Sequence, residues 1–123
     1  MLIEGLYTLT DFSSVNQEIK AKVFLHKEHD IFKGHFPGNP IMPGVCMVQI
    51  IKELTEKALN KQLFLSVSSN IKFMALINPN KTPDLDILIS YTEDDGLVKI
   101  KNTSSFDDTV ALKLSATFKV INE

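Results

Sequence analysis

The chain has a single cysteine, no excess of basic residues and no long apolar run. One cysteine, Cys46, cannot form an internal disulfide, and its apolar neighbours Val45 and Met47 predict a buried thiol in a reducing compartment. Lys and Arg total 13 against 15 Asp and Glu, a formal net charge of -2. This balance argues against the basic surface that nucleic-acid binding requires.

Membrane, export and metal signals are also missing from the sequence. No apolar stretch approaches the roughly 18 residues that span a bilayer, and "MLIEGLYTL" lacks a basic start and a small-residue cleavage site. We therefore expect no membrane span and a cytoplasmic location. His26, His29 and His35 do not have the spacing of a standard metal site, so the sequence predicts no metal and no other cofactor.

The 123 residues, 44% of them hydrophobic, are enough for one compact core, so we expect a single domain over residues 1–123. Alternation in "NQEIKAKVFLH" predicts a strand at 16–26. Pro43 suits a first helical turn, and the absence of Gly and Pro after Gly44 predicts one helix to about Leu59, buried at its start and solvated at its end. Extended segments are expected at 63–74, 85–92, 97–103 and 109–121, with a hairpin at Asp95-Gly96. Together they predict an α+β domain in which a meander of antiparallel strands wraps one central helix.

Unusual residues gather in "KGHFPGNPIMPGVCMVQIIKEL", residues 33–54. His35 precedes a Gly and Pro loop that leads to a helix N-terminus, where free backbone N–H groups can polarise a carbonyl oxygen. A base beside such groups suits proton removal next to a carbonyl. Gln49 lies in the apolar half of the helix and needs a hydrogen-bond partner, either in the core, across a subunit interface or on a substrate. Glu53, one turn on, is expected to be solvated and to pair with Lys57.

The segment "GHFPGNPIMPGV" resembles the signature of the 3-hydroxyacyl-acyl carrier protein dehydratases, hot-dog-fold enzymes of bacterial fatty acid synthesis. The resemblance implies an antiparallel sheet wrapped around one long central helix, and a dimer that builds each site from both subunits. His35 then corresponds to the base that takes the C2 proton of the thioester. The N–H of Gly44 corresponds to the donor for the thioester carbonyl, with Val45 beside it in the substrate-binding group, and the Ile41 carbonyl orients the His ring.

The family's acidic residue, fourteen positions after the His, is replaced here by Gln49. An amide cannot supply a proton near neutral pH, so the acid contribution, typically about 10² to 10⁴ in rate, should be lost. The resemblance thus implies a dehydratase that acts on acyl carrier protein substrates. It is either weakly active alone, as a homodimer, or completed by a related partner in a heterodimer, and higher oligomers stay open. A non-catalytic acyl or carrier protein binder and, third, a thioesterase are the alternatives. Apolar candidates for an acyl tunnel are Met42, Val45, Met47, Val48, Ile50, Phe64 and Phe73.

Overall fold

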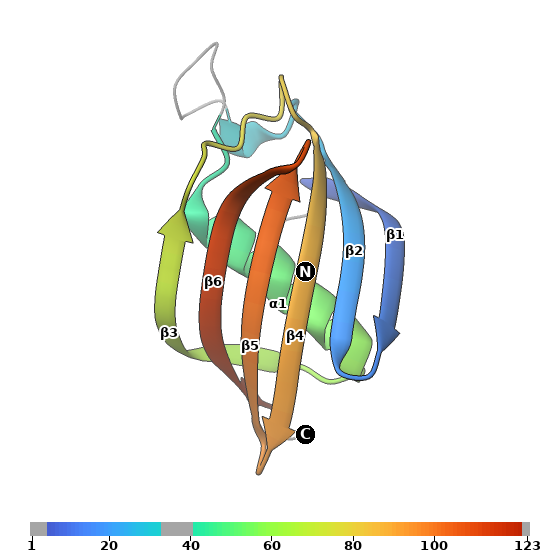
Figure 1. Cartoon of the computed structure of the whole chain (residues 1–123), viewed down its shortest axis with the longest axis vertical. Helices are drawn as coiled ribbons and strands as arrows, with labels where there is room; N and C mark the ends of the chain where they lie inside the picture. Colours follow the sequence, from blue (N-terminus) through green and yellow to red (C-terminus); the bar gives the residue numbers. More distant parts are fainter. Residues whose placement is uncertain (1–4, 33–40, 122–123) are drawn as a thin grey trace.

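A six-stranded antiparallel sheet curls around one helix, as the sequence predicted (Figure 1). The structure is a computed structural model that describes residues 5–32 and 41–121, without the side chains of 67–69. Its elements are β1 (Tyr7–Val15), β2 (Glu18–Leu25), the 3-10 turn η1 (Asp30–Phe32), α1 (Gly44–Leu59), β3 (Leu63–Phe73), β4 (Asp84–Asp94), β5 (Leu97–Phe106) and β6 (Thr109–Val120).

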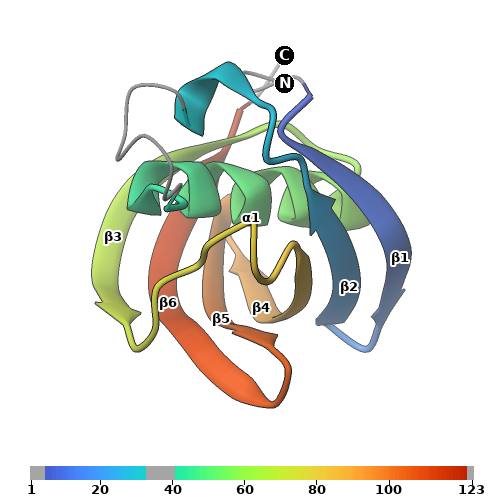
Figure 2. The same ribbon diagram turned by 90° about the horizontal axis from the view of Figure 1, so that it is seen from above.

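The strand order is β1-β2-β4-β5-β6-β3, so the predicted meander is wrong for β3. After the helix, β4, β5 and β6 follow one another through hairpins, while β3 pairs with β6 at the far edge of the sheet. The reason is the helix: α1 carries the chain across the concave face from β2 to the opposite edge, and residues 74–83 bring it back to the free side of β2 (Figures 1 and 2). One edge of β3 is therefore left without a neighbouring strand among the described residues.

The first strand, β1, is a second element before the helix that the sequence analysis missed. It pairs with β2 from Tyr7 opposite Leu25 to Val15 opposite Glu18. Most of its side chains are exposed, so it lacks the clean alternation of a half-buried strand. Its turn also lacks glycine, since Asn16 and Gln17 themselves take positive φ values of 54° and 64°.

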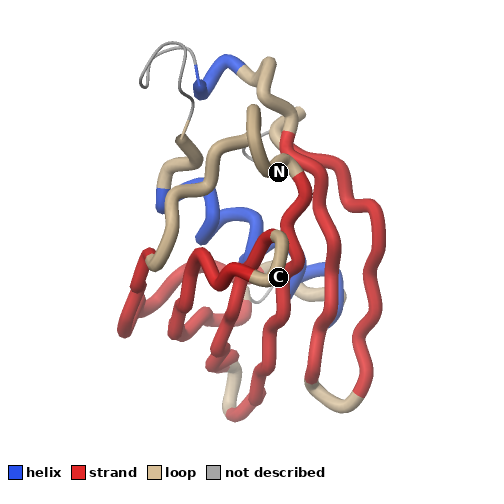
Figure 3. The backbone as a smooth tube through the Cα atoms, turned by 45° about the horizontal axis from the view of Figure 1, so that its top comes forward, coloured by secondary structure: helices blue, strands red, loops and turns tan. Residues whose placement is uncertain are grey.

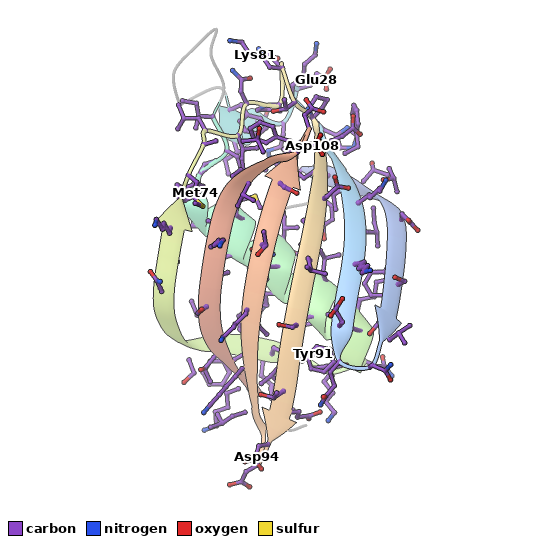
Figure 4. All side chains as sticks on the ribbon, viewed as in Figure 1. Glu28, Met74, Lys81, Tyr91, Asp94 and Asp108 are labelled. Atoms are coloured by element: carbon purple, nitrogen blue, oxygen red, sulfur yellow. The ribbon has the colours of Figure 1, made fainter. Side chains whose placement is uncertain are left out.

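The Asp95-Gly96 hairpin is confirmed, and the β5–β6 turn uses two positive-φ aspartates in the same way. Asp94 and Asp108, labelled in Figure 4, mark these two turns at opposite ends of the sheet.

The helix has the predicted bounds, Gly44 to Leu59. Pro43 is extended at φ -66° and ψ 148°, which starts the helix, and Asn60 ends it in the left-handed region at φ 54°. The buried side chains form one stripe from the first turn to Thr55, namely Cys46, Met47, Ile50, Ile51, Leu54 and Thr55, and none of the last four helix residues is buried. The expected solvated end is therefore confirmed, while the start is wrong in part, because one face of the helix packs on the sheet and the other faces outward, with Val45 78% exposed.

The core lies between this stripe and the concave face of the sheet (Figures 2 and 3). Ile51 and Phe118 are fully buried there, and truncating such a side chain to Ala typically costs about 2 to 5 kcal/mol. In the part of the chain that the structure describes, no helix is long and apolar enough to cross a bilayer. Two features are therefore candidates for function. One is the start of α1 beside β3, and the other is the outward stripe of α1, which carries Gln49 and Glu53.

Candidate functional site

The predicted base, His35, lies outside the described residues, so its role stays a prediction. The description resumes at Ile41, which is half-buried and directly precedes the helix start. Met42 anchors this approach, since its side chain is 2% exposed and its N–H donates to the Ile77 carbonyl at 2.8 Å. The segment that enters α1 is thereby fixed against the loop before β4.

Backbone N–H groups lie at the start of α1, where the sequence analysis expects a donor for a carbonyl oxygen. The first N–H groups of a helix have no intrahelical acceptor, and Pro43 offers no side-chain cap to them. The N–H groups of Cys46 and Met47 turn back to the Pro43 carbonyl at 3.1 and 3.3 Å. The N–H of Gly44 lies before these, at the positive end of the helix dipole, where a carbonyl oxygen would be stabilised.

Packing against β3 explains why residue 44 is a glycine, which the sequence did not reveal. A Cβ placed on Gly44 would lie 3.1 Å from Cε2 of Phe73, the last residue of β3. The glycine therefore allows the Phe73 ring to pack directly against the helix start. Figure 4 shows Met74, the next residue, at the end of β3.

Exposed apolar side chains lie at the helix start, along β3 and directly after it. Val45 is 78% exposed, and further exposed apolar side chains are Leu65, Ile71, Phe73, Met74 and Leu76. Of the tunnel candidates, by contrast, Met42, Met47 and Ile50 belong to the buried core. The tunnel candidates that are exposed are Val45 at the helix start and Phe64 and Phe73 on β3.

Gln49 lies half-buried on the outward stripe of α1, and its partner is Glu53. Gln49 Nε2 donates to Glu53 Oε2 at 2.8 Å, and the Tyr7 hydroxyl donates to Glu53 Oε1 at 2.7 Å. The expectation of a solvated Glu53 paired with Lys57 is wrong, because both carboxylate oxygens accept these bonds and Lys57 Nζ lies 5.4 Å from the centroid of the Phe12 ring.

Tyr7 belongs to the strand that the sequence analysis missed, so this third member of the network was missed with it. Burial first, and then the hydrogen bond and negative charge of Glu53, raise the pKa of Tyr7 far above its ordinary value. The phenol therefore stays a donor at any physiological pH. No local pattern in "YTLTDFSSV" signals a contact 46 residues along the chain.

Within one chain, the helix start and Gln49 do not face the same point. Five residues separate Gly44 from Gln49, which corresponds to about 7.5 Å along the axis and about 140° around it. Gln49 instead borders a surface pocket whose other lining residues are Lys52, Glu56, Lys61, Gln62, Leu63 and Ile121. The N–H of Gly44 points along the helix axis toward its N-terminus, whereas the Gln49 side chain leaves the side of the helix more than one turn further on.

The remaining titratable candidates have local roles. His26 Nε2 lies 2.6 Å from the Thr8 hydroxyl, and His29 Nδ1 accepts the N–H of Ile31 at 3.0 Å. Among the described residues, no group of His, Cys, Asp or Glu is arranged to hold a metal ion. Burial raises the pKa of the Cys46 thiol, which disfavours the thiolate needed for a nucleophile.

A curled antiparallel sheet that wraps a single helix, with a Pro-Gly helix start at its edge, defines this chain as a hot-dog-fold protein. A family model described as "ApeI-like: ApeI dehydratase" matches residues 12–113. The chain belongs to this ApeI-like dehydratase family.

Two curated relatives are named 3-hydroxyacyl-[acyl-carrier-protein] dehydratase FabZ. The one from Lactobacillus helveticus is 31% identical over 98 residues, 74% of this chain and 66% of the relative. The one from Fusobacterium nucleatum is 29% identical over 109 residues, 85% of this chain and 77% of the relative. The match thus spans just under two thirds of the first relative's length.

The fold comparison agrees with the family. A chain of the dehydratase heterocomplex ApeI:P from Xenorhabdus doucetiae superimposes with a TM-score of 0.76 at 21% identity, covering 92% of this chain and 97% of that one. At this identity the superposition establishes the hot-dog fold.

Proposed function

We propose that this chain is a 3-hydroxyacyl-acyl carrier protein dehydratase subunit whose site is completed by a related partner. Its family and its FabZ-named relatives support the reaction class. The main structural support is Gln49, an amide that binds Glu53 through one N–H and has no acidic proton to give, at the helix position where the proposed reaction needs an acid. A cytoplasmic location stays a prediction.

The reaction removes water from the 3-hydroxyacyl thioester to give a trans-2-enoyl thioester. In the proposal His35 takes the proton from C2, and the N–H of Gly44 stabilises the negative charge that develops on the thioester oxygen. The Ile41 carbonyl orients the His ring, and Val45 contacts the substrate. The C3–O bond then breaks, and the hydroxyl leaves as water only if an acid gives it a proton. In a homodimer the residue facing this site would be Gln49 of the second copy, which cannot do this, so in the proposal the proton comes from the carboxyl group of a related partner.

The edge of β3 is the proposed contact with the second subunit. It is the last strand of the sheet, eleven residues long, and Leu65, Ile71 and Phe73 on it are 40%, 41% and 41% exposed. A long apolar edge strand offers both unpaired backbone groups and apolar surface to another chain. Pairing there would place the helix start of one subunit near the outward helix face of the other, which resolves the divergence of Gly44 and Gln49.

Enzyme assays test the proposal. The purified chain, alone and mixed with a related family member that has an acid at the position of Gln49, is supplied with 3-hydroxyacyl-carrier protein, and enoyl formation is measured. We expect little turnover alone and a rise of about 10² or more in the mixture. Strong activity of the chain alone would refute the partner requirement, and inactivity in every mixture would refute the dehydratase assignment.

A second candidate is a protein that binds acyl carrier protein or its acyl chain without catalysis. It is favoured by the hydrogen bond of the Gln49 amide to Glu53 within the same chain. The His35→Ala variant separates the two functions in the mixed assay. A catalytic subunit loses turnover but keeps the ligand, whereas for a binder neither ligand affinity nor the low background turnover changes.

A further inference from the structure

The hydrogen-bond network of Tyr7, Gln49 and Glu53 on the outward stripe of α1 fixes the orientation of the Gln49 amide as well as its position. Glu53 accepts from Tyr7 on one oxygen and from Gln49 on the other, so both of its oxygens are engaged and its rotation is restricted. Tyr7 comes from β1 at the opposite edge of the sheet from β3, which ties the helix face to the N-terminal strand. Glu53 is therefore held in place from a separate element.

The orientation of the Gln49 amide follows from this arrangement. Nε2 and Oε1 lie on opposite sides of the amide carbon, so the bond from Nε2 to Glu53 directs Oε1 away from the carboxylate. Flipping the amide would place Oε1 against Glu53 Oε2, two acceptors with no hydrogen between them. Among the described residues, no hydrogen-bond partner is recorded for Oε1. An acceptor is thus held open on this face of the helix, beside the second N–H of the same amide.

We propose that Glu53, anchored by Tyr7, is a positioning residue that holds the Gln49 carbonyl oxygen toward the ligand, so that this half-site selects thioesters with a 3-hydroxyl group. The inference rests on the proposed function, because it assigns a ligand specificity to the same site. A hydroxyl group can donate its hydrogen to Oε1 and be bound in its uncharged ground state. The same bond gives the hydroxyl oxygen no proton, so it supports binding and not loss of water.

Two variants and one control test the orientation. Glu53→Gln removes the fixed acceptor, since its own amide can face Gln49 either way, and Tyr7→Phe removes the anchor but leaves the pair intact. Glu56→Gln is the matched control. It lies on the same helix and loses the same charge, while its remaining carbonyl can still accept the Leu63 N–H that Glu56 now accepts at 2.8 Å.

The first measurement is NMR of the Gln49 side-chain amide in the full chain. In the wild type and in Glu56→Gln we expect one downfield, slowly exchanging proton, as for an N–H bonded to a carboxylate. In Glu53→Gln this signal should move to the position of a solvated amide, and in Tyr7→Phe it should exchange faster. Identical amide signals in the wild type and Glu53→Gln would overturn the inference.

The second measurement is equilibrium binding of two pantetheine amide analogues of equal chain length, one with a 3-hydroxyl group and one without. The amide replaces the thioester, so neither analogue turns over. One hydrogen bond predicts a preference of about twofold to tenfold for the hydroxyl analogue in the wild type and Glu56→Gln, lost in Glu53→Gln and reduced in Tyr7→Phe. Equal binding by the wild type, or an unchanged preference in Glu53→Gln, would overturn the inference.

Neither measurement depends on turnover. If no mixture of subunits dehydrates a substrate, the proposed function fails, yet the amide signal and the ligand preference still decide the role of Glu53. If the mixtures are active and the preference is absent, the inference fails while the proposed function stands.

Discussion

Replacing Gln49 by Glu should create a pair of carboxyl groups that share one proton. In the wild type, Gln49 Nε2 lies 2.8 Å from Glu53 Oε2. A carboxylate in place of that amide cannot donate, so it loses the hydrogen bond and adds a like charge at close range. One member of such a pair keeps its proton to a higher pH than an isolated Glu.

The magnitude follows from the separation. Two unit charges about 4 Å apart repel by about 4 kcal/mol at an effective dielectric constant of 20 and by about 1 kcal/mol in water. Gln49 and Glu53 are half-buried, so we expect about 2 kcal/mol. This corresponds to a rise of about 1.5 in one pKa, from about 4.3 to about 6.

The sign of the pH dependence is then fixed. A carboxyl group with a raised pKa in the folded state contributes its stability below about pH 4.3, and this contribution is lost as pH rises through about 6. Urea unfolding of Gln49→Glu and the wild type should therefore diverge between pH 4 and pH 8. The expected difference is about 2 kcal/mol, or about 1 M in the urea midpoint.

The exchanged double variant Gln49→Glu/Glu53→Gln is the control. Its new amide can donate to the new carboxylate, so the pair has one negative charge, as in the wild type, and the stability difference should not change with pH. In the dehydration assay, both variants should gain activity without a partner, and the activity of Gln49→Glu should fall as pH rises through about 6, where the acid loses its proton. A pH-independent stability difference for the single variant would refute the predicted coupling between the two side chains.

Three further predictions concern the rest of the framework. Tyr7→Phe should lower the free energy of unfolding by about 1 to 2 kcal/mol at neutral pH. Above pH 10 the two stabilities should converge, because the unfolded phenol of the wild type ionises there while the raised folded pKa keeps Tyr7 protonated. Parallel stability curves in alkaline urea titrations would contradict this. Ile71→Lys should convert the proposed dimer to monomer in light scattering, while Asn70→Lys, one residue earlier and also exposed, should not. A dimeric Ile71→Lys excludes the proposed edge. The stability of Gly44→Ala should stay within about 1 kcal/mol of the wild type, since the gain in helix propensity offsets a tight contact with Phe73. Gly44→Leu should lose about 2 kcal/mol or more of stability in thermal unfolding. An unchanged stability of Gly44→Leu would contradict the contact.

The helix and the later strands could be predicted because their signals are local. Pro43 starts α1, and no breaker interrupts it before Asn60. The alternation of β2 and the Asp95-Gly96 turn also lie within a few residues of sequence. The strand β1 could not be recognised in this way, because its exposed side chains give no period and its turn uses Asn16 and Gln17 without glycine.

Contacts between distant segments were beyond local patterns. The pairing of β3 with β6 depends on where the helix delivers the chain, and the bond of Tyr7 to Glu53 depends on how β1 curls over the helix. The sequence analysis did foresee that Gln49 needs a partner, from the cost of burying an amide. It chose the wrong surroundings for Glu53 because lysine at i+4 is a common helix pair and the aromatic ring of Phe12, which Lys57 contacts instead, comes from the missed strand.

An amide at position 49 and a carboxylate at position 53 share one hydrogen bond, and the negative charge lies at position 53. Residue 53 lies one turn, about 6 Å, further along the helix axis than residue 49. There Tyr7 engages the second carboxylate oxygen, so Glu53 is committed to the strand β1. A small shift of the substrate would not restore the acid, since reaching Glu53 would break two hydrogen bonds. The acid is therefore expected from another chain, and the open carbonyl of Gln49 from this one.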